Sequence, residues 1–552
     1  MPKAKAPHPA DPRLPAPWLL AAAAFWLVPD QKIVRAKLLA LQAAVLLAGA
    51  LLARANAARR EAARRAPLDA PVAALALSGL IFWALSPERA AAETEATRLL
   101  FCCLTYWASS RAFADGGPRL FCAAWSAGAC AAGAWAVLQA VGGHTRPFAS
   151  FGNPIFLGVP LAASLPLALA GARAAESGRA RAPWIAAIAL ETAGLALTGS
   201  RAAPFGLAAG LALWALARWK GGRRAWALAA AVAAAVAAAW LFRGREWTHG
   251  LIWRDALALW RAKPWLGCGL GRFHLELPAF ASAALKARWP EGRVVINFAH
   301  NEYLQTLVET GPAGLAALLS VPVVALLDLR HREPDANRDA CAAGALILFA
   351  AAFVSPDLRF GASAFAAFAL LGASTRTSAS GMPAPTPLTA SALLACAWLA
   401  AKPALAVRRN ATESTFYTGA NAARVAELED RLLRAPGDAD AAEELGFLKA
   451  KASDFAGAAD AFRRAAALDP RRPGSLNNLG NLAYLAGDAD GAIAWWEKSL
   501  AAAPEQIDAR LNLAKLLCER GRLKDCARHL EDVLRRDPSN PKARVLYKKM
   551  VE

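Results

Sequence analysis

The stretch INFAHNEYLQTLVETGPAGLAALL, residues 296–319, changes from polar to apolar within a few positions. His300, Asn301 and Glu302 stand directly before a run long enough to cross a membrane, since a spanning helix needs about 20 mostly apolar residues. Two interpretations are open: a solvated loop end, or an active site at the membrane surface. The choice depends on whether the chain spans a membrane and on which side this stretch lies.

The composition is typical of a polytopic membrane protein. The chain has 552 residues, 56% of them hydrophobic, with a mean hydropathy of +0.28. We expect an all-α fold: a bundle of about 12–13 transmembrane helices, followed by a helical solenoid. The apolar runs lie at about 17–29, 38–53, 71–86, 99–113, 120–141, 154–171, 183–198, 203–217, 225–242, 302–327, 340–355, 359–373 and 387–405.

The net charge of +20 follows topology rather than a nucleic-acid surface, because the basic residues lie largely in short loops between apolar runs. Four basic loops, at 53–65, 171–181, 217–224 and 329–338, alternate along the predicted spans so that all fall on one face. The positive-inside rule makes that face cytoplasmic. The opposite, external face then receives the long stretch 243–301, which includes His300.

The tail after the last apolar run has a strict period. Pro436, Pro470, Pro504 and Pro538 are each 34 residues apart, which is the length of a tetratricopeptide repeat. We therefore expect three regions: a cytoplasmic tail at 1–16, a membrane domain at 17–405 with a large periplasmic loop at 243–301, and a repeat domain at 406–552 on the periplasmic side. The repeats are expected either to bind a peptide or partner protein or to serve as an assembly scaffold.

The nine cysteines lie mostly inside apolar runs and show no metal-ligand spacing, so no metal site is expected. Cys518 and Cys526 could form a disulfide if the tail is extracytoplasmic. Packed core thiols are commoner, and we favour that state for the pair.

Basic and titratable residues on the external face are candidates for chemistry. Arg146, Arg201 and Arg254 could bind phosphate through their planar guanidinium groups, or could merely reach toward lipid headgroups. His300 can act as a general base because its ordinary pKa lies near neutrality. Asn301 can also act as a simple helix N-cap. Helical phase puts Glu309 opposite His300, which predicts a hydrogen-bonding role between helices near the Gly311-Pro312 kink.

Several stretches resemble the O-antigen ligase and polymerase family of bacterial envelope glycosyltransferases. The matching stretches, which come in the family's order, are RPFASFGNPIFLGVPLAASLPLAL (146–169), LTGSRAAPFGLAAG (197–210), RDALALWRAKPWLGCGLGRF (254–273) and FAHNEYLQTLVETGPAGL (298–315). The resemblance covers most of residues 70–375. One departure is Gly152-Asn153-Pro154-Ile155, where the family often has Asn-Pro-Asn, which leaves a role for Asn153 in doubt.

The resemblance implies an enzyme of the bacterial inner membrane that needs neither metal nor cofactor. A glycan would leave an undecaprenyl-pyrophosphate carrier and join an acceptor hydroxyl on lipid A-core, a polysaccharide or a protein. His300 would activate the hydroxyl, while Arg201, Arg254 and Arg146 would hold the pyrophosphate. Asn301, Glu302 and Tyr303 of the same motif would support the site. The alternatives are a non-enzymatic scaffold that presents the repeats, and a polysaccharide or lipid transporter.

Overall fold

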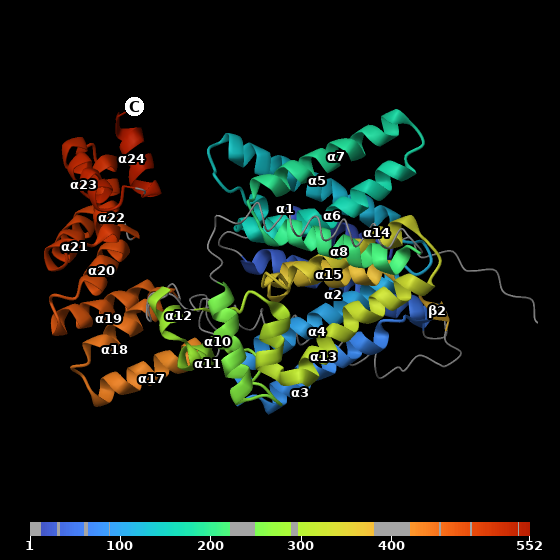
Figure 1. The fold of residues 1–552 in the computed structure, drawn as a ribbon, viewed down its shortest axis with the longest axis horizontal. Coiled ribbons are helices and arrows are strands. Elements are labelled where there is room, and N and C mark those ends of the chain that lie inside the picture. Colours follow the sequence, from blue (N-terminus) through green and yellow to red (C-terminus); the bar gives the residue numbers. More distant parts are fainter. Residues whose placement is uncertain are drawn as a thin grey trace, which may run out of the picture. The chain divides into compact units, whose positions relative to one another are not determined.

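The computed structural model describes residues 13–29, 34–59, 64–87, 89–220, 249–288, 296–379, 420–451, 454–485, 488–538 and 540–551. The chain divides into two compact units, residues 1–406 and 407–552 (Figure 1). Both units are built from helices, as the sequence predicts.

The first unit is a helical bundle whose helices follow the predicted apolar runs. Its bundle helices are α1 (Ala16–Leu27), α2 (Val34–Arg59), α3 (Asp69–Leu85), α4 (Arg89–Ala112), α5 (Arg119–Val141), α6 (Pro154–Ala174), α7 (Gly178–Leu197), α8 (Ala202–Arg218), α13 (Glu302–His331), α14 (Ala336–Ala351) and α15 (Gly361–Ser374). Eleven of the predicted runs thus coincide with helices. The predicted spans at 225–242 and 387–405 lie outside the described residues.

Three helices among the described residues are long and apolar enough to cross a membrane: α5, α6 and α13. Further apolar helices of 10–17 residues lie at Ala16–Leu27, Lys37–Leu52, Asp69–Leu85, Ala202–Arg218 and Gly361–Ser374. With the apolar composition of the chain, these helices make the first unit a membrane domain.

Small residues allow the bundle helices to approach closely. On α8, a Cβ atom at Gly206 or Gly210 would collide with α14 at 2.5–2.9 Å from backbone or side-chain atoms of Ile347 and Ala351. Membrane helices gain packing contacts in this way because lipid supplies no hydrophobic force between them.

One end of the bundle carries the basic connections. Arg218 at the end of α8 pairs with Asp339 at 2.8 Å, and Arg332 pairs with the same carboxylate at 2.9 Å. The short strands β1 (Arg64–Arg65) and β2 (Ser378–Ala379) pair with each other antiparallel. Contacts from Arg332 to the Ser374 carbonyl bring the segment before β2 to this end as well. Three of the four predicted cytoplasmic loops therefore meet at one end of the bundle.

The second unit consists of the predicted helix pairs. Its helices are α17 (Ala420–Arg434), α18 (Ala439–Lys451), α19 (Phe455–Leu468), α20 (Pro473–Leu485), α21 (Ala489–Ala502), α22 (Ile507–Glu519), α23 (Leu523–Arg536) and α24 (Pro541–Val551). Gly446 and Gly480 face the rings of Phe462 and Trp496, whose bulk fills the space that the missing side chains leave. Each periodic proline comes two residues after a helix end, where it stops the helix.

The thiols of Cys518 and Cys526 form a disulfide between α22 and α23. The favoured expectation of packed thiols is therefore wrong, and the alternative of a disulfide holds. The antiparallel helix pair brings the two positions face to face, with their Cα atoms 5.4 Å apart, which sequence spacing alone does not reveal.

Candidate functional site

The described part of the long connection before α13, at 249–288 and 296–301, is folded rather than extended. It contains α10 (His249–Ala262), α11 (Phe273–Phe280) and α12 (Ala283–Arg288), which share an apolar core with the start of α13. The buried members of that core are Ile252, Ala256, Leu259, Cys268, Phe273, Leu277, Leu285, Ala299 and Val308. This core fixes α10 against the segment that holds His300.

A glycine-rich turn locks the connection into the kink of α13. Pro312 has no N–H to bond the carbonyl of Val308, four residues earlier, and Gly311 leaves the helical conformation at φ 66°. The N–H groups of Cys268 and Gly269 fill the vacated positions by donating to the carbonyls of Val308 and Glu309, at 2.8 and 3.0 Å. The motifs PWLGCGLG (264–271) and ETGPAG (309–314) therefore bind each other through backbone hydrogen bonds.

His300 lies against a second histidine. The imidazole rings of His249 and His300 are parallel, with centroids 4.3 Å apart and an angle of 6° between their planes. His300 has φ 54°, in the left-handed region that non-glycine residues seldom adopt and that is enriched at functional sites. This backbone turn carries the ring out of the line of α13 toward α10.

Trp253 holds α10 beside His300. Its indole N–H donates to the carbonyl of Ala299, the residue before His300, at 2.8 Å. Trp253 also meets the ring of Phe353 edge-on at 5.8 Å, and Phe353 in turn stacks with Phe205 of α8. Three separate parts of the chain therefore converge around the histidine pair.

The positive charge of Arg201 acts on His249, one ring of this pair. Arg201 is the N-cap residue of α8, and burial together with the Arg201 guanidinium lowers the pKa of His249. Burial, together with the repulsion that a protonated His249 would add, lowers the pKa of His300 to about 4. Both imidazoles are therefore uncharged near neutral pH, the form in which a histidine can accept a proton.

The other two candidate arginines lie differently. Arg146 is exposed and donates from Nε to the carbonyl of Thr198 at 3.0 Å, three residues before Arg201. The side chain of Arg254 is 58% exposed and bonds Asp255 at 3.2 Å and Ser282 at 2.5 Å. Five residues along α10 place Arg254 about 140° around the helix from His249. The structure thus joins Arg146 to the Arg201 turn, whereas Arg254 projects from another face of α10.

The predicted supporting residues anchor the start of α13. Asn301 caps the helix by accepting from the N–H of Leu304 at 3.0 Å, and the Tyr303 hydroxyl donates to the carbonyl of Phe349 on α14 at 2.7 Å. Asn153 similarly caps α6 by accepting from the N–H of Ile155. Asn301 and Asn153 thus cap the starts of their helices, and Tyr303 ties α13 to α14.

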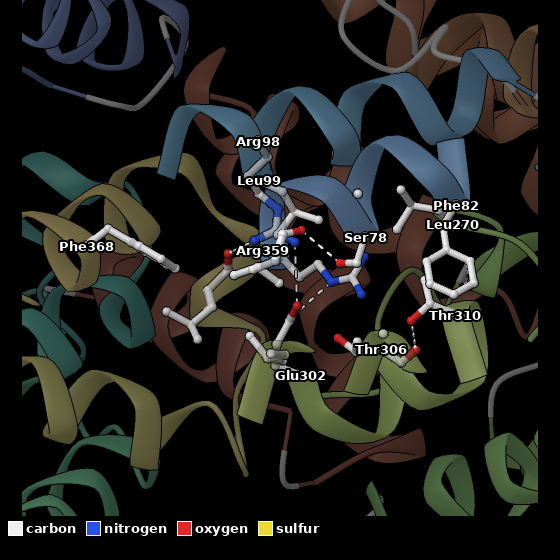
Figure 2. A pocket seen from close by; sticks show the side chains of 15 residues that line it. Ser78, Phe82, Arg98, Leu99, Leu270, Glu302, Thr306, Thr310, Arg359 and Phe368 are labelled. Carbon is white, nitrogen blue, oxygen red and sulfur yellow. Dashed lines mark hydrogen bonds and ion pairs between the residues drawn. The ribbon is translucent and has the colours of Figure 1, made fainter. Parts of the chain in front are cut away.

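Glu302 belongs to a buried cluster of charges. Arg359, in the turn Asp357–Arg359, lies 2.9 Å from both Glu302 and Glu309. Arg98 and Glu95 of α4 complete the cluster, with Arg98 at 2.8 Å from Glu95 and 3.5 Å from Glu302. Figure 2 shows Arg98 and Arg359 converging on Glu302 at one wall of a cavity that Phe82, Leu270 and Thr310 also line. The inter-helix role predicted for Glu309 is confirmed.

Sequence reasoning missed His249, Trp253 and Arg359. His249 and Trp253 are four residues apart, so they lie on the same face of α10. This spacing can be recognised in the sequence. The approach of that face to His300 is not visible in the sequence, because 51 positions separate the two histidines. Nothing in the local sequence distinguishes Arg359 from other arginines in short connections. Its carboxylate partners, Glu95, Glu302 and Glu309, are revealed only by the structure.

Comparison with known proteins finds two families that are similar to parts of this chain. The family model for O-antigen ligase matches residues 185–319, and a tetratricopeptide-repeat model matches residues 483–549. Arg201, His249, Arg254 and His300 all lie inside the first match. A search of the curated proteins finds no match.

The matching solved structures include tetratricopeptide-repeat proteins. The repeat domain of Arabidopsis OM64 is 19% identical, with 20% of this chain and 93% of that chain covered and a TM-score of 0.20. MamA is 21% identical over 23% of this chain and 68% of that one, with a TM-score of 0.19. A thermophilic tetratricopeptide-repeat protein of Thermus thermophilus is 19% identical, with 30% of this chain and 83% of that chain covered and a TM-score of 0.21.

The two family models and the solved structures each match only part of this chain. The predicted resemblance is nevertheless confirmed by the two family models. The chain is a helical membrane protein that is similar to the glycan-ligating O-antigen ligase family over residues 185–319 and carries tetratricopeptide repeats near its carboxyl end.

Proposed function

We propose that the protein is an integral-membrane glycosyltransferase that moves a glycan from an undecaprenyl-pyrophosphate carrier to an acceptor hydroxyl. One observation carries this proposal: within the ligase-like segment, the fold brings uncharged His300 and cationic Arg201 to the same histidine, His249. A base and a phosphate-binding cation are the two groups that such a transfer needs.

The proposed reaction is a single displacement at the sugar's anomeric carbon. His300 accepts the proton of the acceptor hydroxyl as its oxygen forms the new bond to that carbon. The bond from the carbon to the pyrophosphate oxygen breaks, and undecaprenyl pyrophosphate leaves with both electrons of that bond. The proton on His300 then passes to water or to the released pyrophosphate, which restores the base.

The arginines would stabilise the departing pyrophosphate. Guanidinium groups stay charged and match pairs of phosphate oxygens, so the proposed step needs no metal ion. Arg201 has the strongest claim because its charge already acts on His249, which stacks on His300. Arg146 lies next to the same turn, and Arg254, with its exposed side chain, would have to rotate toward a bound donor. The negative donor would also raise the pKa of His300 and make it a stronger base.

The proposed location is the bacterial inner membrane, with the histidine pair and the repeat domain on the periplasmic side. The basic connections gathered at one end of the bundle support this orientation, since such loops favour the cytoplasm. The disulfide in the tail supports it independently, because disulfides persist in oxidising compartments. The repeats would then bind a protein acceptor or an assembly partner.

The test uses the full chain in proteoliposomes. The donor is undecaprenyl-pyrophosphate-linked glycan extracted from a deletion strain, and the acceptor is the solubilised envelope fraction of the same strain. We expect His300→Ala to abolish transfer and Arg201→Ala to lower it by about 100-fold or more, as loss of a charge-stabilising group does. Full activity of His300→Ala, with normal membrane insertion, would contradict the proposed chemistry and favour a scaffold.

A further inference from the structure

The proposed transfer step leaves one ring of the site without a task. The imidazole of His249 covers that of His300 face to face, at 4.3 Å between centroids and 6° between planes. Parallel rings present their faces to each other, while their nitrogens point outward around the rim. A proton therefore does not pass directly from one ring to the other, and His249 is not a relay partner of His300.

Two features hold the His249–His300 stack: a hydrogen bond from α10 to the backbone before His300, and the backbone conformation of His300 itself. Trp253 lies one helical turn after His249 and donates to the carbonyl of Ala299, the residue directly before His300. The left-handed backbone of His300 turns its ring onto His249. The plane of the His300 ring is thus set by the docking of α10, and His249 is the surface against which it rests.

We propose that His249 is a positioning residue for His300, and that its uncharged ring stabilises the imidazolium that His300 becomes on accepting a proton. The inference rests on the proposed function, in which that proton comes from the acceptor hydroxyl. A cation over the face of an aromatic ring is attracted to it. Because this attraction grows as the proton arrives, the contact lowers the barrier rather than merely binding the resting state.

This role requires His249 to remain neutral, since two cationic rings would repel each other. Burial and the charge of Arg201 both act against protonation of His249. Arg201 therefore has a second task besides contact with phosphate. It keeps His249 in the form that can stack on a protonated His300.

The test compares substitutions of His249 in the proteoliposome assay, with initial rates measured over a range of donor concentrations. His249→Phe keeps a neutral aromatic face, and we expect a rate within about 3-fold of the parent because the stack persists. His249→Ala and the bulkier His249→Leu remove that face, and we expect kcat to fall about 10–100-fold while KM for the donor changes little. His249→Lys adds a fixed charge and should lower kcat further.

His144 offers a matched control, since it is an exposed histidine whose ring meets Phe148 edge-on at 5.8 Å. His144→Ala should leave the rate unchanged. Parent-like rates for both His249→Ala and His249→Leu would overturn the inference. So would a correctly inserted His249→Phe that is as slow as His249→Leu, because stacking would then not be what matters.

A double variant separates this inference from the proposed function. If His249 acts through His300, adding His249→Leu to His300→Ala should cause no further loss. A further loss would show that His249 acts by a separate route, against the inference. An active His300→Ala single variant contradicts the proposed function itself, whereas an inactive one beside a fully active His249→Leu contradicts only the stacking role.

Discussion

Arg359 lies 2.9 Å from the carboxylate of Glu302, and both side chains are almost fully buried. The pair joins the turn before α15 to the first residue of α13, two positions after His300. Glu309, at 2.9 Å, and Glu95, at 3.2 Å, share the same guanidinium. Arg359 thus connects its own turn to α13 and α4, and Arg98 is the second cation of the same cluster.

Replacing this cation should destabilise the membrane domain strongly. Arg359→Met leaves three buried carboxylates short of a partner, and we expect the free energy of unfolding to fall by about 3–5 kcal/mol. Unfolding by SDS titration of the purified protein measures the change. Lys263→Met, which breaks the partly exposed pair with Glu276, is the control and should cost less than about 1 kcal/mol. Equal effects of the two substitutions would count against the cluster's structural role.

The kink of α13 should tolerate no side chain at Gly311. Its backbone, at φ 66° and ψ −169°, lies in a region essentially confined to glycine, which costs another residue about 1–3 kcal/mol, and a Cβ there would overlap the carbonyl oxygen of Trp265. We expect Gly311→Ala to release the glycine-rich turn and expose the 249–288 connection to trypsin. Gly117 has a similar φ, 67°, with open space around it, so Gly117→Ala measures the cost of a side chain at positive φ without any overlap. A Gly311→Ala protein as stable and as protease-resistant as Gly117→Ala would rule out the docking contact.

The stability of the protein should fall in acid partly because of His300. Its pKa of about 4 in the folded chain lies below the value of about 6.5 expected when unfolded. Between these pH values the unfolded chain binds more protons than the folded one, so stability falls as pH falls through this window. We expect His300→Asn, which suits the left-handed backbone, to lessen the drop in melting temperature between pH 7 and pH 5. An unchanged drop would mean that His300 titrates normally.

The disulfide of the tail gives a test of compartment. If the repeats are periplasmic, the denatured full-length protein taken from intact cells should react with two more maleimide groups after reduction than before. The Cys518→Ser variant should show no such difference, because its remaining partner cannot form the bond. Equal labelling before and after reduction in the parent would place the tail in a reducing compartment or leave the pair open.

Local patterns in the sequence were sufficient for much of the fold. Apolar runs marked eleven helices of the bundle, because burial in lipid demands continuous apolar stretches. The 34-residue spacing of four prolines marked the repeats, since each unit ends its second helix at the same offset. His300 and Arg201 were visible as polar residues at the edges of apolar runs.

The remaining features depend on contacts between distant positions. His249 meets His300 across 51 residues because α10 packs on the start of α13 and the turn around Gly267 and Gly269 enters the kink at Gly311. Arg254, a candidate by its sequence position, points away because the phase of α10 is set by the apolar face that packs on α13.

The sequence by itself therefore determined where the helices run, how the tail repeats and which residues have the right chemistry. Apolar length and helical period are properties of neighbouring residues, so they can be recognised along the chain. Only the tertiary structure decided which of the candidates meet. The rings of His249 and His300, the carboxylates around Arg359 and the disulfide of the tail each join positions whose proximity results from packing between helices, which no local pattern encodes.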